Sequence, residues 1–177
     1  MKVCTILSNG FEEVEAIGTI ALLLRSGLEV DIYALNDTQA SGKHNLVLAN
    51  INKLNEINTN DYDALLLPGG PHYAELEASV KVKSIITKFM NENKLVASIC
   101  AAPTILGHMG YLENKKYTCF TSMNADFKGT YMDQYVVTDG NLITARSAAA
   151  SIDFAFAIIN YLQGDKQEKK IKEQIYY

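Results

Sequence analysis

Cys100 is the residue of this sequence whose position best suits chemistry. It follows the apolar run Leu95–Ile99 and precedes a helix-like segment with Pro103 in its first turn. A cysteine between strand and helix stands on a sharp turn. The crowding at such a turn requires small residues two positions either side, here Ser98 and Ala102. Positive charge at the helix N-terminus favours the thiolate, so this thiol is expected to be more acidic than free cysteine. The alternative is an inert cysteine at the end of a core strand.

Three carboxylates form a second candidate group. Glu12, Glu13 and Glu15 stand at the start of an expected helix whose continuation, Ala16–Leu24, carries no charge. Carboxylates at a helix start complement the helix dipole, which is sufficient to explain Glu12 and Glu13. A helix that is apolar on all sides needs a second cover, so the sequence predicts a homodimer that uses it.

A third group lies in the turn Pro68–His72. Its two glycines are explained by a turn that needs positive φ, and the turn lacks the glycine pattern of a nucleotide-phosphate loop. His72 is the histidine that could lie near Cys100 and act as its base, which is a hypothesis. His44, in a loop, and His108, on the helix after Cys100, are expected to be structural or solvated.

The alternation of strand and helix patterns predicts an α/β fold with a mostly parallel sheet covered on both faces. The turns after three strands then meet at the carboxyl rim of the sheet, where sites of such folds form. Asn36–Lys43 is expected to be a loop, Asn45–Ile51 a weak strand, and Asp165–Tyr177 a charged helical tail. The other expected strands are Lys2–Leu7, Leu28–Leu35, Tyr62–Leu67, Leu95–Ile99 and the two around the Asp139–Asn141 turn; the other helices are Val80–Met90, Thr104–Tyr111 and Ala148–Leu162.

Composition limits the function classes. The 177 residues suit one domain, residues 1–177, and the net charge of -4 provides no basic field for nucleic acid or an anionic membrane. Three cysteines, an odd number, and the absence of a signal-peptide pattern indicate a reducing, cytoplasmic location. No apolar run reaches the length needed to span a bilayer.

Several segments together resemble the ThiJ/PfpI superfamily, which includes DJ-type proteins and shares the fold of class I glutamine amidotransferase domains. The resemblance covers nearly the whole chain. It is carried by Gly10–Glu15, Tyr62–Asp63 with Leu67–Gly70, Ile99–Thr104, Leu142–Arg146 and Phe154–Ile158.

The resemblance implies a three-layer, flavodoxin-like sandwich, a dimer and a rim site. By residue-to-residue match, Cys100 is the nucleophile and Glu15 is its protonated partner, with a carboxyl pKa raised by the adjacent thiolate. The match also assigns the backbone N–H groups of Gly70 and Ala101 to an oxyanion hole.

Two departures from the superfamily concern histidine. Protease-like members have histidine directly after the cysteine, where this chain has Ala101, and other members can have one on the next strand, here Thr118–Thr121. A cysteine peptidase or amidase is therefore disfavoured. Cys119 on that strand is either packed core or a thiol that resolves oxidised Cys100. The histidine and cysteine spacing predicts no metal site, and the resemblance implies no cofactor.

Two functions follow. By resemblance, the first is a cofactor-independent, glyoxalase- or deglycase-like enzyme that converts small reactive carbonyls through Cys100 and Glu15. The second is a non-enzymatic redox sensor, with chaperone-like binding, in which an oxidant modifies Cys100 in response to oxidative stress. Neither function calls for nucleic acid or a membrane.

Overall fold

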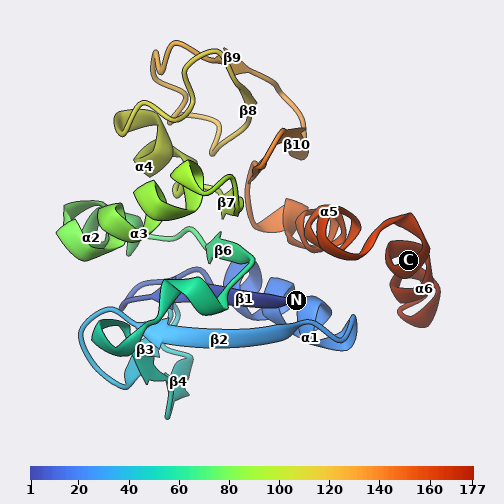
Figure 1. The fold of residues 1–177 in the computed structure, drawn as a ribbon, viewed down its shortest axis with the longest axis horizontal. Helices are drawn as coiled ribbons and strands as arrows, with labels where there is room; N and C mark the ends of the chain where they lie inside the picture. The colour runs from blue at the N-terminus through green and yellow to red at the C-terminus, as the bar shows by residue number, and fades with distance from the viewer.

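The computed structural model describes residues 1–177 and contains a seven-stranded central sheet (Figure 1). All neighbouring strands are parallel except the last pair, β10 and β11, which form the predicted hairpin. The strand order is β10 (Val136–Asp139), β11 (Leu142–Ala145), β7 (Leu95–Ile99), β6 (Ala64–Leu67), β1 (Lys2–Leu7), β2 (Glu29–Ala34) and β5 (Asn52–Lys53).

Helices cover both faces of this sheet, which confirms the predicted three-layer α/β fold. One apolar cluster joins the sheet to α1 (Thr19–Arg25), α5 (Ser151–Gln163) and α6 (Asp165–Gln174). The other joins it to α2 (Tyr73–Ala78), α3 (Val80–Asn91) and α4 (Pro103–His108). Since both faces are covered, β6 and β7 are buried throughout; β6 is a continuous apolar run, and β7 is apolar except for Ser98.

Three short stretches differ from the expectations. Asn36–Lys43 is not all loop, because β3 (Gln39–Ser41) pairs with β4 (Val47–Ala49) in a small antiparallel sheet. The helix α2 was not expected either. The segments that form β3 and α2 are too short and too polar for their hydrophobic periodicity to predict an element. A second small sheet pairs β8 (Lys116–Tyr117) with β9 (Thr130–Tyr131), and its segment extends beyond α4 in Figure 1.

The C-terminal tail forms the expected helix, α6. Ile171 is its buried anchor, and Gln167 donates a hydrogen bond of 2.7 Å to the Ser26 carbonyl at the end of α1. On the charge-free stretch predicted over Ala16–Leu24, Leu24 remains 52% exposed, and Val14 just before it is 55% exposed, so part of this apolar surface has no cover within the chain. None of the helices combines the length and apolar character that crossing a membrane requires.

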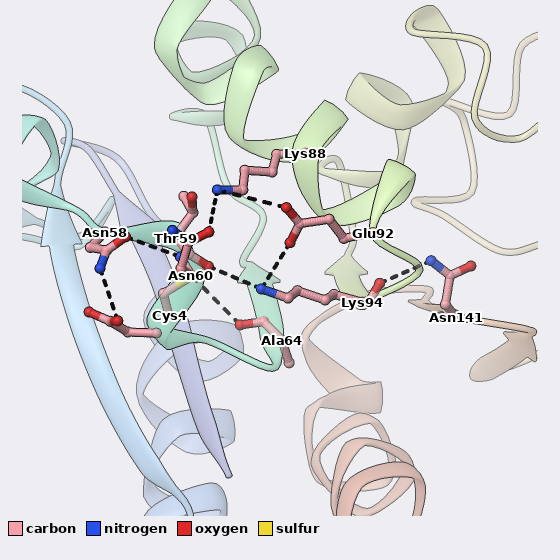
Figure 2. A network of polar contacts seen from close by, with 10 residues as sticks. Cys4, Asn58, Thr59, Asn60, Ala64, Lys88, Glu92, Lys94 and Asn141 are labelled. Carbon is pink, nitrogen blue, oxygen red and sulfur yellow. Dashed lines mark hydrogen bonds and ion pairs between the residues drawn. The ribbon is translucent and has the colours of Figure 1, made fainter.

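The amino ends of the central strands are joined by a polar network (Figure 2). Lys94, just before β7, lies 3.0 Å from the Glu92 carboxylate and donates to the Thr59 carbonyl at 3.3 Å. Asn141, just before β11, donates to the Lys94 carbonyl at 2.9 Å. These bonds fix the ends of the strands opposite the rim at which Cys100 stands.

Candidate active site

Cys100 occupies a strained turn between β7 and α4. Its φ of +64° lies in the left-handed region, which non-glycine residues adopt at a cost. The Cys100 N–H donates to the Ala145 carbonyl at 2.9 Å, and its carbonyl accepts from the Phe120 N–H at 2.8 Å. Pro103 begins α4, where its missing N–H costs nothing. Bonds to two neighbouring segments therefore hold the thiol at the rim.

Glu15 reaches the same point from a single turn of π-helix, η1 (Val14–Gly18). Such wide turns are rare in proteins as a whole. Those that occur often lie at functional sites, because they redirect one side chain. Glu12 Oε2 accepts the Glu15 N–H at 2.8 Å and so begins this helix. The Glu15 carboxyl group is 1% exposed and interacts with the Cys100 side chain. Its Oε2 accepts the Gly69 N–H at 2.9 Å, whereas its buried Oε1 has no hydrogen-bond partner in the chain.

The two glycines after β6 allow this close approach. A Cβ on Gly69 would lie 2.6 Å from both Cys100 Cβ and Glu15 Oε2. Gly70 has a φ of +99°, as its turn requires, and its N–H interacts with the Cys100 sulfur together with the N–H of Ala101. Gly69 and Gly70 therefore form the turn and also direct their N–H groups at Glu15 and Cys100.

Burial dominates the electrostatics of the pair. It raises the pKa of Glu15 to about 7, and Glu12 adds to this, while the adjacent Cys100 side chain and the hydrogen bond from the Gly69 N–H oppose it. Burial and the facing Glu15 carboxylate raise the pKa of the Cys100 thiol to about 12. The expectation of a thiol more acidic than free cysteine is thus wrong for this pair.

One proton is shared by the pair over a wide pH range, because two adjacent negative charges in a buried site are unfavourable. Above neutral pH the pair is a monoanion. Backbone N–H groups favour the charge on sulfur, and the Gly69 N–H favours it on Glu15. Transfer of the proton from Cys100 to Glu15 gives the thiolate and the carboxylic acid.

A cavity of about 310 Å³ opens over the sulfur. It brings together residues from the three predicted turns, namely Glu15, Gly70, Cys100 and Ala101. Its other lining residues are Glu12, Lys43, Pro71, Tyr73, Phe120, Met123, Ser147, Ala148 and Ala149. The site is thus a small, mostly apolar pocket with a few convergent polar groups.

His72 is not among the lining residues, and its ring is engaged elsewhere. Nδ1 accepts the Ser8 N–H at 3.1 Å, and Nε2 donates to the Pro68 carbonyl at 2.9 Å. Burial lowers the pKa of His72 to about 4, so the ring is neutral. The hypotheses that His72 binds substrate or acts as a base are therefore wrong in this arrangement, and the ring instead fixes the loop.

The remaining histidines and cysteines lie outside the reacting pair. Cys119 is fully buried in the cluster on the α3 side, whereas Cys100 packs against the cluster on the α5 side. His108 contacts Glu77 at 2.5 Å on the surface. His44 contacts Glu13 at 3.0 Å, and Glu12 and Glu13 together with His44 form the one group with ligand atoms close enough to hold a metal. The sequence did not predict this group.

Sequence patterns missed several lining residues. Lys43 comes from the turn between β3 and β4, Phe120 and Met123 from the segment after β8, and Ser147–Ala149 from the turn after β11. The last of these could have been inferred, since it also follows a parallel strand at the same rim. No sequence pattern indicated that Lys43 or Phe120 would line the cavity.

Fold and site together define a cysteine-centred, flavodoxin-like α/β protein with a carboxyl group against the thiol at the rim of its sheet. Comparison with known proteins gives the family: the DJ-1/PfpI family model matches residues 1–161, and the chain belongs to this family.

Relatives from several kingdoms are similar to it. DJ-1 homolog B of Arabidopsis thaliana is 35% identical over 89% of this chain, which spans only 37% of that protein. Deglycase PH1704 of Pyrococcus horikoshii is 34% identical, with 84% of this chain and 92% of that protein covered. The crystal structure of a cysteine-to-alanine mutant of the DJ-1 superfamily protein STM1931 from Salmonella typhimurium superposes with a TM-score of 0.93 at 32% identity, covering 99% of this chain and 98% of the other.

Proposed function

We propose that this protein is a cofactor-independent enzyme that converts small reactive carbonyl compounds, in the manner of a glyoxalase or deglycase. The observation that carries the proposal is the pair of Cys100 and Glu15, which share one proton beneath a small cavity. Relatives named deglycase support the substrate class. A volume of about 310 Å³ suits a substrate with few heavy atoms.

The first step is addition of the sulfur to an aldehyde carbon. Proton transfer from Cys100 to Glu15 supplies the thiolate, the C–S bond forms, and the electron pair of the C=O bond moves to oxygen. The N–H groups of Gly70 and Ala101 stabilise that oxygen, and Glu15 returns the proton to it, which gives a hemithioacetal.

The second step moves hydrogen between the two carbons of a dicarbonyl. The Glu15 carboxylate removes the proton from the sulfur-bearing carbon, and the electron pair moves through the new C=C bond to the second carbonyl oxygen. Glu15 returns that proton to the neighbouring carbon, and the hydroxyl proton moves to the second oxygen, which yields a 2-hydroxyacyl thioester. Water hydrolyses this thioester, which releases the hydroxy acid and restores the thiol without any external oxidant.

Glyoxal and methylglyoxal test this proposal. Hydroxy acid formation, followed by NMR, is expected for the wild-type protein and is expected to be lost in Cys100→Ser. Cys4→Ser is the matched control, because Cys4 is fully buried in β1 and outside the cavity. Turnover that survives in Cys100→Ser, or no turnover in the wild type, would contradict the proposal.

A second function, redox sensing by Cys100, is supported by the different exposure of the thiols. Cys4 and Cys119 are both 0% exposed, whereas Cys100 opens on the cavity. Peroxide is therefore expected to oxidise Cys100 first, which peptide mass spectrometry can measure. Equal oxidation of all three cysteines would exclude this function. The positions of Cys100 and Cys119 in opposite clusters favour a sulfinate over a disulfide.

The apolar surface at Val14 and Leu24 supports a homodimer. The three free cysteines suit a reducing compartment, so we propose a cytoplasmic location. Sedimentation is expected to give twice the monomer mass of 19.5 kDa. A Leu24→Glu variant is expected to sediment as the monomer, because it puts a charge on the proposed contact. Wild-type protein that sediments as a monomer would exclude the dimer.

A further inference from the structure

Lys43 is the only basic side chain that lines the cavity over Cys100. It belongs to the turn between β3 and β4 and not to any of the three turns that provide Glu15, Gly70 and Cys100. The lining contains no histidine. Any positive charge that the chain brings to a substrate there is therefore that of Lys43.

The backbone of Lys43 is fixed against the segment that precedes Glu15. Its N–H donates to the Phe11 carbonyl at 2.9 Å, and the neighbouring Gly42 forms a bridge with Phe11. Gly42 also lies against the Glu13 side chain, since a Cβ there would be 2.3 Å from Glu13 Oε1. Glu13 accepts the His44 N–H at 2.6 Å and lies 3.0 Å from the His44 ring. The turn is thus held on both sides of Lys43.

The ammonium group of Lys43 is less tightly held than its backbone. Its Nζ lies 3.6 Å from Glu12 Oε1, which is an ion pair but longer than a good hydrogen bond. Its charge nonetheless reaches the reacting pair, because it lowers the pKa of Glu15 against the larger effect of burial. The group is thus near enough to act at the site and free to move toward a ligand.

The proposed reaction needs a positive charge in addition to the oxyanion hole. A dicarbonyl has two oxygens, and the N–H groups of Gly70 and Ala101 serve only the one on the carbon that bonds to sulfur. When Glu15 removes the carbon-bound proton, negative charge develops on the second oxygen. A cation within hydrogen-bond reach of that oxygen stabilises such charge.

We propose that Lys43 is a catalytic residue of this reaction, whose ammonium group donates a hydrogen bond to the second carbonyl oxygen and stabilises the enediolate. The inference rests on the proposed function, whose second step acts on a 1,2-dicarbonyl, and it assigns the group that binds the second oxygen of that substrate. Lys43 keeps its proton throughout, and the proton that reaches carbon comes from Glu15. A simple aldehyde, which has no second oxygen, gains nothing from Lys43.

Lys43→Met tests the charge with little change in side-chain length, and Lys43→Arg restores it. With methylglyoxal, kcat of Lys43→Met is expected to fall about 10²-fold, and Lys43→Arg is expected to recover part of it. With methylglyoxal deuterated at the aldehyde carbon, the isotope effect on kcat is expected to rise in Lys43→Met, because proton removal becomes slower. Lys53→Met, in the exposed strand β5, is the matched control and is expected to behave as the wild type.

Alkylation of Cys100 by iodoacetamide separates this role from a general effect on the thiol. The alkylation rate of Lys43→Met is expected to stay within about threefold of the wild type, because alkylation forms no enediolate. A parallel loss of alkylation and turnover, or turnover that Lys43→Met leaves unchanged, would overturn the role of Lys43 alone. A wild-type protein with no Cys100-dependent turnover would overturn the proposed function and this role together.

Discussion

The two ends of the central sheet differ in whether their polar groups have hydrogen-bond partners. At the amino ends, Lys88, Lys94 and Glu92 form partly exposed ion pairs and hydrogen bonds (Figure 2). At the carboxyl ends, Glu15 and Cys100 are packed together with one carboxyl oxygen unpartnered and one backbone in the left-handed region. The amino end satisfies its polar groups, whereas the carboxyl end does not.

A comparison of fully buried Cys4 with partly buried Cys100 shows what this difference means. Cys4 and Cys100 both have a pKa raised to about 12, and burial is the main cause for each. Cys4 Sγ donates to the Ala64 carbonyl within the sheet, 3.6 Å away, and faces no cavity. Cys100 faces a carboxyl group, two N–H donors and open space. A raised thiol pKa therefore does not by itself distinguish Cys100 from Cys4. The groups around the Cys100 sulfur distinguish it.

The largest effect is expected from Glu15→Gln, measured as stability against pH. Because burial raises the folded-state pKa of Glu15 from 4.5 to about 7, folding favours its protonated form. This contribution is fully present below pH 4.5 and is lost as the pH rises to about 7, a change of about 3 kcal/mol. Urea unfolding of Glu15→Gln is expected to lose that part of the pH slope. The exposed control Glu113→Gln should keep it, and an unchanged slope in Glu15→Gln would contradict the buried pair.

Gly69→Ala is expected to reduce kcat/KM about 10²-fold, because the added Cβ would lie 2.6 Å from both members of the pair and push them apart. The control is Gly107→Ala, whose Cβ would lie 2.4 Å from the Phe127 ring, away from the cavity. Both variants should be less stable on thermal unfolding, but only Gly69→Ala should lose turnover. Equal activity of the two would show that the spacing of the pair is unimportant.

Cys4→Ser is expected to destabilise the protein by about 1–2 kcal/mol, because it buries a more polar hydroxyl group in a fully buried strand position. Its turnover should stay within about twofold of the wild type. Urea unfolding and steady-state kinetics on one preparation measure both. A large loss of activity would mean that the two cysteines differ less than their surroundings suggest.

The smallest effect is expected from Lys88→Ala, at the amino end of the sheet. Lys88 pairs with Glu92 at 3.8 Å and with Asn60 at 2.6 Å, and its side chain is partly exposed. Such pairs contribute less than about 1 kcal/mol. Raising the salt concentration should reduce even this difference in the free energy of unfolding. A fall of several kcal/mol in the free energy of unfolding would show that the amino end of the sheet depends strongly on this ion pair.

The sequence by itself determined the main layers of the fold and the turn that carries Cys100. Long apolar runs such as β7 and the period of α3 are local patterns, and parallel strands necessarily bring their following turns to one rim. Residue types alone could not separate Glu15 from Glu12 and Glu13, and the assignment of Glu15 came from resemblance to a family.

The tertiary structure decided what surrounds the thiol. The π-turn that directs Glu15, the bonds that remove His72 from the cavity, and the turn that brings in Lys43 all depend on contacts between segments far apart in the chain. The pKa values followed the same rule. A helix N-terminus is a local feature and favours a thiolate, but burial and a facing carboxylate, which only packing creates, outweigh it at Cys100.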